Sequence, residues 1–324
     1  MSLLFRDAAG PSLAPGGSVL CVGAFDGVHR GHRALLARVR ERAAALGCAP
    51  LAVSFEPIPR AFFARGAAVP RLAGVREKIA FLTEADTRLL LLRFDAALAA
   101  MPAEAFIERI LVGRAGAREI WIGGDFRFGQ GRRGDAAMLR AFGERHGFSV
   151  SVMPDVEIGG ERVSSSAIRL HLAAGEFDAA ARLLGRRFAI GGHVVRGQQL
   201  GRRLGYPTAN VRLGRRVSPV AGIFAVRVHA AATGGQRALD AWPGVASLGV
   251  RPTVDGGGEP LLEAHLFDFD GDLYGRRIEV EFVQKLRDEA KFADLDAMVR
   301  QIDRDAADAR RILRVSACAQ PASR

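Results

Sequence analysis

The first 185 residues alternate between short apolar runs and segments with helical periodicity, and this alternation restricts the fold more than any other sequence feature. The apolar run at residues 18–25 (SVLCVGAF) is followed by a helical pattern over residues 31–46, with Gly47 as its stop signal. Strands that alternate with helices form a parallel sheet with helices on both faces. We expect strands at residues 18–25, 51–55, 89–94, 119–122 and 148–153, and helices at residues 31–46, 75–84, 103–112, 135–146, 165–174 and 177–184. The Pro-containing residues 56–63 (EPIPRAFF) are expected to form a loop.

Residues 186–324 have a different pattern. Helical periodicity gives way to short alternating runs between turns that contain Gly or Pro, which is typical of a small antiparallel barrel. We expect strands at residues 189–195, 222–229, 244–249, 261–267 and 277–282, and a final helix at residues 293–313. Because 324 residues suffice for two domains, we predict an α/β domain over residues 1–185 and a barrel domain over residues 186–324.

The chain is strongly basic, with a net charge of +11 and a pI of about 10.8. Such a charge is compatible with a nucleic-acid partner, with small anionic ligands, or with a compositional preference for arginine. The surplus is spread evenly, with +5 before residue 186 and +6 after it. Since a nucleic-acid protein more often concentrates its charge in one arm or stripe, the even spread slightly favours the compositional interpretation.

Only three lysines are present, Lys78, Lys285 and Lys291, and none follows a glycine. The Gly-Lys-Ser/Thr sequence of a P-loop is therefore absent, as are the strand and loop signatures of protein kinases. A protein of this sequence that uses ATP must bind it by other means.

The three cysteines, Cys21, Cys48 and Cys318, are too few and too scattered for a disulfide framework or a zinc site. No apolar run reaches about 18 residues, and the N-terminal residues do not resemble a secretory signal. We expect a cytoplasmic protein that does not bind a membrane.

Residues 23–32 (GAFDGVHRGH) lie between the first expected strand and the first expected helix. Glycines allow the backbone to approach a ligand closely, and the free N–H groups at a helix start attract phosphate. His29 and His32, three residues apart, project from one face of the first turn. Two imidazoles that donate hydrogen bonds suit a reaction in which negative charge builds up on a leaving pyrophosphate.

This string resembles the motif of adenylyltransferases with a His-x-Gly-His element, and in particular that of the bacterial bifunctional riboflavin kinase/FAD synthetase family. Residues 124–129 (GDFRFG) and residues 162–169 (RVSSSAIR) resemble two further motifs of the family, in the same order. The resemblance implies a nucleotidyltransferase-like domain with a Rossmann-like parallel sheet. Residues 129–134 (GQGRRG) also fit the Gly-x-Gly-x-x-Gly dinucleotide fingerprint, but that interpretation is rejected, because the fingerprint belongs at the first strand-to-helix turn of its domain.

The resemblance also implies roles for individual residues. His29 and His32 would stabilise the ATP phosphates and the transferring adenylyl group. The remaining residues implied to bind ATP are Gly23, Phe25, Asp26, Gly27, Ser164, Ser165 and Arg169. Asp125 and Phe128 would lie on the flavin side. Ser164 and Ser165 also suit the cap of the following helix, a role compatible with phosphate binding.

One position departs from the family pattern. Ile58 stands between Pro57 and Pro59, where the family usually has a histidine associated with the flavin phosphate. Ile58 cannot form a hydrogen bond, so one polar contact is missing unless a neighbour such as Arg60 replaces it. Adenylyl transfer is therefore the less secure of the implied activities.

In the second domain, residues 197–210 (GQQLGRRLGYPTAN) combine three glycines with a Pro-Thr-Ala-Asn turn. A kinase without a P-loop still needs backbone N–H groups for phosphate and oxygen ligands for Mg²⁺. The Thr208 hydroxyl and the Asn210 carboxamide are the predicted metal ligands. The segment closely resembles the riboflavin kinase motif, which implies that Gly197, Gly201, Gly205, Thr208 and Asn210 bind ATP.

Glu263 lies on an expected strand and shares one face with His265, whereas Leu262, Ala264 and Leu266 share the other. A carboxylate in this position can accept the proton of an attacking hydroxyl. By resemblance to flavokinases, Glu263 is the general base acting on the 5′-hydroxyl of riboflavin, and His265 is structural. Residues 247–253 and 286–292 also fit the family, which places Arg287, Glu289 and Phe292 on the flavin side.

The sequence therefore predicts a bifunctional enzyme that uses Mg²⁺, ATP and riboflavin to make FMN, and FMN and ATP to make FAD. Its partners would be these small molecules, with no nucleic acid and no membrane; an oligomer is compatible with the sequence. Two alternatives stay open. One is a riboflavin kinase with weak or altered adenylyltransferase activity, and the other is a non-catalytic protein that binds nucleic acid or flavin.

Overall fold

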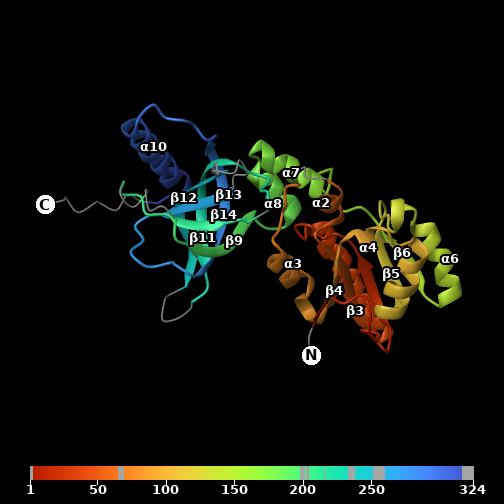
Figure 1. Ribbon diagram of the computed structural model, residues 1–324. Coiled ribbons are helices and arrows are strands. Elements are labelled where there is room, and N and C mark those ends of the chain that lie inside the picture. The colour runs from red at the N-terminus through yellow and green to blue at the C-terminus, as the bar shows by residue number, and fades with distance from the viewer. Residues whose placement is uncertain are drawn as a thin grey trace. The chain divides into compact units, whose positions relative to one another are not determined.

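The computed structural model describes residues 3–64, 69–197, 201, 204–214, 216–232, 238–250 and 260–315. The chain forms two compact units (Figure 1). Unit 1 consists of Met1–Val69 and Val75–Ser165, and unit 2 of Pro70–Gly74 and Ser166–Arg324. Each unit has its own sheet and its own core.

Unit 1 contains a six-stranded sheet in the order β1-β4-β3-β2-β5-β6, and every pair in it is parallel. The strands are β1 (Leu4–Phe5), β2 (Ser18–Val22), β3 (Ala49–Glu56), β4 (Arg88–Arg93), β5 (Ala117–Gly123) and β6 (Ser149–Met153). A two-stranded ribbon, β7 (Glu157–Ile158) and β8 (Glu161–Arg162), follows the sheet. The α/β prediction with a parallel sheet is confirmed.

Successive residues of the central strands enter two different cores, because side chains alternate between the faces of a strand. In β2, Leu20 and Val22 belong to one cluster, whereas Val19 and Cys21 belong to the other. Helices α1 (Arg30–Leu46) and α3 (Val75–Leu82) contribute to the second cluster, and η2 (Phe106–Arg114) and α6 (Ala136–His146) to the first. Helices therefore cover both faces of the sheet, as a buried parallel sheet requires.

Several boundaries in unit 1 differ from the expected ones. Helix α1 ends as predicted at Gly47, which takes the left-handed conformation at φ 62°. The first strand stops at Val22, earlier than expected, because the next residues turn out of the sheet. The expected helix at 103–112 begins as α5 (Ala103–Ala105) and continues as the π-helical η2. Elements that sequence patterns missed include α2 (Pro59–Phe63), within the expected loop, and α4 (Ala96–Ala99).

Unit 2 contains a closed barrel in the order β10-β13-β12-β11-β14-β9, and all its pairings are antiparallel. The strands are β9 (Ala189–Val195), β10 (Ala209–Arg212), β11 (Gly222–Ala230), β12 (Leu239–Val250), β13 (Pro260–Leu266) and β14 (Arg277–Arg287). The barrel prediction is confirmed. Strand β10 was not predicted, because it begins inside the Pro-Thr-Ala-Asn turn.

Aromatic side chains fill the barrel, and helices pack on it. Phe224 and Phe282 are fully buried with ring centroids 5.0 Å apart. Phe177 of α8 (Phe177–Leu184) lies 5.8 Å from Phe224. Helix α10 (Leu295–Leu313) contributes Ala309 and Leu313 to a separate cluster with barrel residues. Barrel, α8 and α10 thus form one folded unit.

Helices α7 (Ser165–Ala174) and α8 have the predicted bounds, but they group differently from the prediction. The compact units divide between Ser165 and Ser166, so both helices belong almost entirely to unit 2. The predicted boundary at residue 185 placed them in the α/β domain. The contact of Phe177 with the barrel aromatics explains the grouping, and no local sequence pattern reports a contact of this kind.

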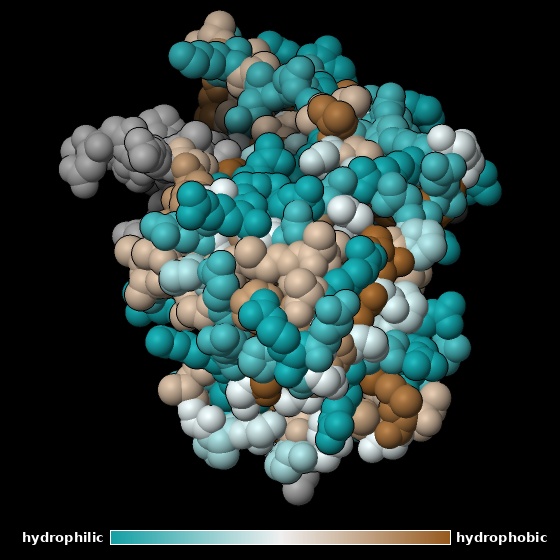
Figure 2. Space-filling view, turned by 90° about the vertical axis from the view of Figure 1, so that its right-hand side faces the viewer, coloured by the Kyte–Doolittle hydropathy of each residue, from teal (hydrophilic) through white to brown (hydrophobic). Residues whose placement is uncertain are grey.

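Hydrophilic side chains predominate on the face in Figure 2, with small hydrophobic patches between them. Within the described parts of the chain, no helix is both long enough and apolar enough to cross a membrane.

We expect Phe282→Ala to lower the unfolding free energy of unit 2 by about 3–5 kcal/mol, because it leaves a cavity among buried rings. Urea denaturation monitored by circular dichroism measures the change. Leu46→Ala removes an exposed side chain of α1 and should cost less than about 1 kcal/mol. An equal effect of the two substitutions would contradict the assignment of Phe282 to the barrel core.

A pH-dependent contribution to stability comes from Glu119 of β5. Its carboxylate accepts hydrogen bonds from Arg42 Nε of α1 at 2.9 Å and from Trp121 Nε1 at 2.6 Å, and the Arg42 hydrogen bond is the main cause that lowers its pKa. Because folding lowers this pKa, the stabilisation is complete above the ordinary value of 4.5 and is lost as pH falls through the lowered value. Glu119→Gln should therefore make the unfolding midpoint of unit 1 less sensitive to pH below about 5. An unchanged pH dependence in denaturation curves would contradict this.

Candidate functional sites

A pocket of about 300 Å³ lies at the carboxyl ends of β2, β5 and β6 in unit 1. Ligands bind at this edge of open parallel sheets. The predicted site residues that line it come from three separate parts of the sequence: Gly23, Phe25, His29, His32, Asp125, Ser164 and Ser165. The fold thus brings together most of the residues predicted for adenylyl transfer.

The two histidines are in contact at the start of α1. Their rings stack with centroids 3.6 Å apart and planes inclined by 17°. The backbone N–H of His32 donates to Nδ1 of His29 at 3.3 Å, so His29 caps the helix. With Nδ1 accepting, a neutral His29 carries its proton on Nε2 and can donate from there. A Cβ at Gly31 would lie 3.3 Å from the His29 ring, so glycine leaves room for this arrangement.

His32 is held in its neutral form. Its pKa lies well below the ordinary value of 6.5, chiefly because the ring is buried, and also because His29 and Lys78 disfavour a positive charge on it. Its Nδ1 atom is buried and has no hydrogen-bond partner among the described residues. An unpaired buried polar atom is costly, so this nitrogen is available for a ligand.

The loop before the histidines has an unusual backbone. Phe25, Gly27 and Val28 have φ values of 49°, 82° and 41°. A positive φ is rare for a β-branched residue such as Val28 and indicates local strain. The buried side chains of Phe25 and Val28 maintain the conformation, and Ser54 Oγ donates to the carbonyl of Gly23 at 3.0 Å.

Arg162 joins two sides of the pocket, although its site role was not predicted. Its Nη2 lies 2.6 Å from Asp125 Oδ2 and its Nε lies 2.9 Å from Asp155 Oδ2. The hydrogen bond from Arg162 lowers the pKa of Asp125, whose side chain is exposed. The position of Arg162 directly before the Ser-rich helix start was the available sequence signal.

Four predicted residues do not line this pocket. Asp26 is buried, and its carbonyl accepts a hydrogen bond from Ser165 Oγ at 3.0 Å. Gly27 supplies a left-handed turn. Phe128 lies in the core, stacked 5.5 Å from Phe126, and it is Phe126 that lines the pocket. Arg169 belongs to unit 2, where its Nε donates to the carbonyl of Pro70 at 2.8 Å.

Ile58, at the departure from the family pattern, is buried at the start of α2. It therefore makes apolar contacts where a histidine would offer a polar one. Arg60, the residue considered as its replacement, is exposed, and neither side chain lines the pocket.

A second pocket, of about 330 Å³, lies on the outer face of the barrel under α10. The predicted residues that line it are Gly201, Thr208, Glu263, Arg287, Glu289 and Phe292. Residues that sequence reasoning did not assign to the site also line it: Leu204, Tyr206, Val245, Ser247, Met298, Ile302 and Asp305. Met298 and Ile302 belong to the helix expected at residues 293–313, which the sequence did not connect with a site.

Strand register places Glu263 on the outer face of the barrel. Leu262 and Ala264 are fully buried inside, so the residue between them points outward. Glu263 lies directly opposite Asn210 of β10 and Ser247 of β12. The predicted base and one predicted metal ligand are therefore cross-strand neighbours. His265 Nδ1 lies 2.9 Å from the carbonyl of Pro207, which agrees with a structural role.

Asn210 is 4% exposed. Its Nδ2 donates to the carbonyl of Thr208 at 3.2 Å, whereas its Oδ1 has no hydrogen-bond partner among the described residues. A Cβ at Gly197 would lie 2.8 Å from this oxygen, so the backbone at Gly197 closes over the carboxamide. Gly205, the remaining predicted glycine, forms a left-handed turn at φ 84° and does not line the pocket.

A smaller cavity, of about 190 Å³, adjoins the Pro-Thr-Ala-Asn turn. Pro207, Thr208 and Ala209 line it on one side, and residues 269–274 line it on the other. Thr208 lines both this cavity and the pocket of Glu263. Thr208 therefore separates the 190 Å³ cavity from the pocket of Glu263.

Ion pairs attach α10 to the barrel beside the Glu263 pocket. Asp305 receives hydrogen bonds from Arg287 Nη2 at 2.7 Å and from Gln301 Nε2 at 2.9 Å. The Tyr206 hydroxyl donates to Asp303, and burial together with this bond raises the pKa of Tyr206 to about 12. Tyr206 therefore stays protonated at neutral pH.

The motifs at residues 197–210 and 247–253 are only partly described by the structure. A Cβ at Gly249 would meet the Glu289 carboxylate, so this side chain packs directly against the Gly249 backbone. Residues 198–200, 202–203 and 251–253 of the predicted motifs, together with Cys318, lie outside the described residues.

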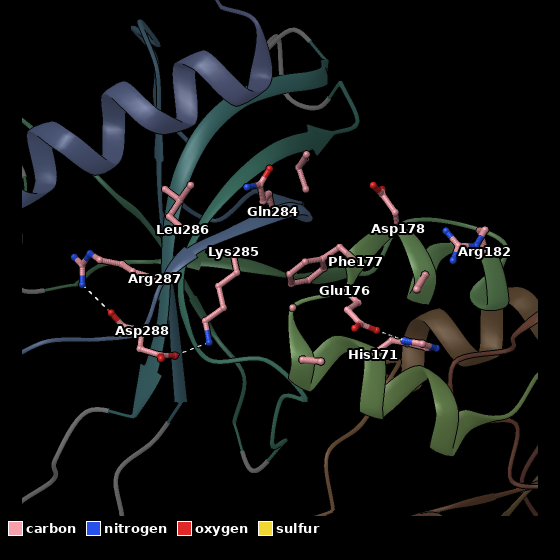
Figure 3. Close-up of a pocket in the computed structure, with 14 residues that line it drawn as sticks. His171, Glu176, Phe177, Asp178, Arg182, Gln284, Lys285, Leu286, Arg287 and Asp288 are labelled. Atoms are coloured by element: carbon pink, nitrogen blue, oxygen red, sulfur yellow. Dashed lines mark hydrogen bonds and ion pairs between the residues drawn. The ribbon is translucent and has the colours of Figure 1, made fainter.

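A third, open cavity of about 840 Å³ lies between the α7–α8 turn and the end of β14 (Figure 3). His171 Nδ1 lies 2.5 Å from Glu176 Oε2, and Lys285 Nζ lies 2.5 Å from Asp288 Oδ1. Arg287 borders both this cavity and the Glu263 pocket. The sequence did not predict this cavity, because its two walls are about 100 residues apart.

A histidine pair at the first helix of a parallel α/β unit, and a carboxylate beside an oxygen-bearing turn on a barrel, are features expected of a two-domain enzyme that transfers phosphorus-containing groups. The FAD synthetase family model matches residues 12–167 and the riboflavin kinase model matches residues 184–313. The two models leave residues 168–183, which include most of α7 and α8, to neither domain.

Whole-chain comparisons agree with the family models. The bifunctional riboflavin kinase/FMN adenylyltransferase of Pseudomonas fluorescens is 48% identical and covers 93% of this chain and 94% of its own length. That of Escherichia coli K12 is 45% identical, over 91% and 92%. A crystal structure described as a macrolide-efflux protein from Streptococcus pneumoniae has a TM-score of 0.77 and 27% identity, over 98% of this chain and 100% of that one. The chain belongs to the bifunctional riboflavin kinase/FMN adenylyltransferase family.

We expect Asp305→Asn to lower the unfolding free energy of unit 2 by about 1–3 kcal/mol, because it weakens a buried charge-assisted pair with Arg287. Asp308→Asn is the matched control, since Asp308 pairs with Arg311 on the exposed side of the same helix and should change stability by less than about 1 kcal/mol. Denaturation curves compare the two variants. Equal losses would show that the Arg287–Asp305 pair does not hold α10.

Proposed function

We propose that the chain makes FAD from riboflavin in two ATP-dependent steps, with residues 186–324 as the kinase domain and residues 1–185 as the adenylyltransferase domain. The kinase step converts riboflavin and ATP to FMN and ADP, and the second step converts FMN and ATP to FAD and pyrophosphate. The observation that carries the proposal is that each unit has its own pocket lined by the residues predicted for its reaction.

For the kinase step, Glu263 accepts the proton of the riboflavin 5′-hydroxyl as the oxygen attacks the γ-phosphorus of ATP. The 330 Å³ pocket suits the flavin, since Met298, Ile302 and Phe292 offer apolar contacts beside the carboxylate. ATP enters the smaller cavity on the other side of Thr208. In this proposal the transferred phosphoryl group lies near Thr208, which lines both cavities.

Thr208 and Asn210 are the proposed ligands of Mg²⁺, which neutralises phosphate charge when bound. The buried Oδ1 of Asn210, without a hydrogen-bond partner among the described residues, supports this role. Both protein ligands are neutral. The charge that attracts the ion would therefore come from the ATP phosphates, as is usual for Mg²⁺ in kinase sites.

For the adenylyl step, a phosphate oxygen of FMN attacks the α-phosphorus of ATP and pyrophosphate leaves. Nε2–H of His29 and the neutral ring of His32 stabilise the charge that develops on the phosphates. Ser164 and Ser165 line the same pocket and are the proposed contacts of the triphosphate. Positioning and electrostatics accomplish this step without a covalent enzyme intermediate.

The flavin side of the adenylyl site is assigned to Asp125 and Phe128. Asp125 lines the pocket directly, and Phe128 supports it through its stacking on Phe126. We also propose a cytoplasmic enzyme whose partners are ATP, riboflavin and FMN rather than nucleic acid or membrane. The modest positive charge of each half would attract these anionic nucleotides.

The division of labour is tested by supplying riboflavin or FMN with MgATP and separating the products by chromatography. We expect Glu263→Gln to slow FMN formation by about 10²- to 10⁴-fold and to leave the conversion of FMN to FAD unchanged. His29→Ala should have the reverse effect, because its ring lies in the other unit.

Glu279→Gln, an exposed carboxylate on β14, is the control for the loss of one negative charge on the barrel. A normal rate of FMN formation in Glu263→Gln would refute the base assignment. If the wild-type protein makes no FAD from FMN and ATP, the adenylyl-transfer half of the proposal is wrong. The protein would then be a riboflavin kinase whose other domain is altered, for example by Ile58 in place of the usual histidine.

A further inference from the structure

Lys78 of α3 is fully buried, with no exposed surface at all. A buried charge is costly unless other groups compensate it, and the predicted chemistry of the adenylyl site does not use this lysine. Lys78 contacts the end of β3, which adjoins the loop that carries the histidines.

The contacts of Lys78 fix the carboxyl end of β3. Its Nζ donates to the carbonyl of Phe55 at 2.7 Å and lies 3.7 Å from Glu56 Oε2. The preceding residue, Ser54, donates through Oγ to the carbonyl of Gly23 at 3.0 Å. The end of β3 is therefore bonded to Lys78 and, through Ser54, to the loop that carries the histidines.

Helix α3 also packs beside the first turn of α1. Phe81, one turn after Lys78, has its ring 5.1 Å from the guanidinium carbon of Arg33, the neighbour of His32. Ile79 packs on the cluster that contains Phe25 and Val28. These contacts place the Lys78 charge in the same layer of the unit as the histidine pair.

We propose that Lys78 is a positioning residue for adenylyl transfer, whose ammonium fixes the end of β3 beside the histidine loop and adds positive charge to the surroundings of His32. The inference rests on the proposed adenylyl-transfer function. Its consequence is that His32 meets the triphosphate as a neutral imidazole.

The charges around His32 agree with this arrangement. Burial lowers its pKa most, followed by His29 on the same helix turn and Lys78 on α3. The nearby carboxylates are Glu56 at the end of β3, which lies beside the Lys78 ammonium, and the buried Asp26 in the loop. Loss of the Lys78 charge removes one cause that keeps His32 neutral, so protonation of His32 should begin at a higher pH.

The test compares Lys78→Gln, which keeps a donor for Phe55 but loses the charge, with Lys78→Met, which loses both. We expect both variants to slow FMN-to-FAD conversion about 10- to 100-fold and to move the acid side of its pH profile to higher pH. Riboflavin phosphorylation in the same molecules should stay within about twofold of wild type, because Glu263 lies in the other unit.

Arg76→Met is the matched control, because Arg76 is exposed on the same helix and loses the same charge; both activities should remain unchanged. A Lys78→Gln pH profile identical to that of wild type would overturn the proposal. If wild type itself makes no FAD, the proposed function fails instead.

A measurement on the wild-type enzyme covers the case in which neither Lys78 variant folds. Imidazole NMR, with His32 assigned by comparison with His32→Gln, should show a neutral His32 from pH 6 to pH 8. Titration of His32 near the ordinary value of about 6.5 would overturn the proposal without any Lys78 variant.

Discussion

The backbone between β2 and α1 has to leave the sheet and begin a helix within a few residues, and the adenylyl site depends on how it does so. Phe25 and Val28 adopt left-handed conformations that their buried side chains enforce. After this turn, His29 is the N-cap residue of α1, and the ring of His32 stacks on the ring of His29. The energy for this strained loop comes from packing in the core, so fold stability and site geometry cannot be separated here.

In the barrel unit the pocket of Glu263 lies on the outer face of the barrel rather than in its interior. Helix α10 lies over this face, and the Arg287–Asp305 pair joins it to β14. The same pair borders the pocket of Glu263. The helix expected from the sequence at residues 293–313 thereby lines the pocket proposed for the kinase step.

Local patterns in the sequence predicted the two fold classes and most of the helices, because apolar periodicity and caps such as Gly47 are local properties. They also predicted the histidine pair and Glu263, whose motifs are continuous in sequence. They did not predict that α8 packs on the barrel, that Arg162 joins Asp125 to Asp155, or that Lys78 is buried. Each of these depends on tertiary contacts between distant segments. Phe126 and Phe128 illustrate the limit well, since strand-like alternation could not say which ring reaches the pocket.

Thr208 lines two adjacent cavities at once. A side chain in such a wall cannot be adapted to one ligand without altering the space available to the other. If the two cavities hold flavin and nucleotide as proposed, a change in flavin preference that involves this wall would alter nucleotide preference as well. The α/β unit offers more freedom, because its pocket draws on three separate segments that can vary one at a time.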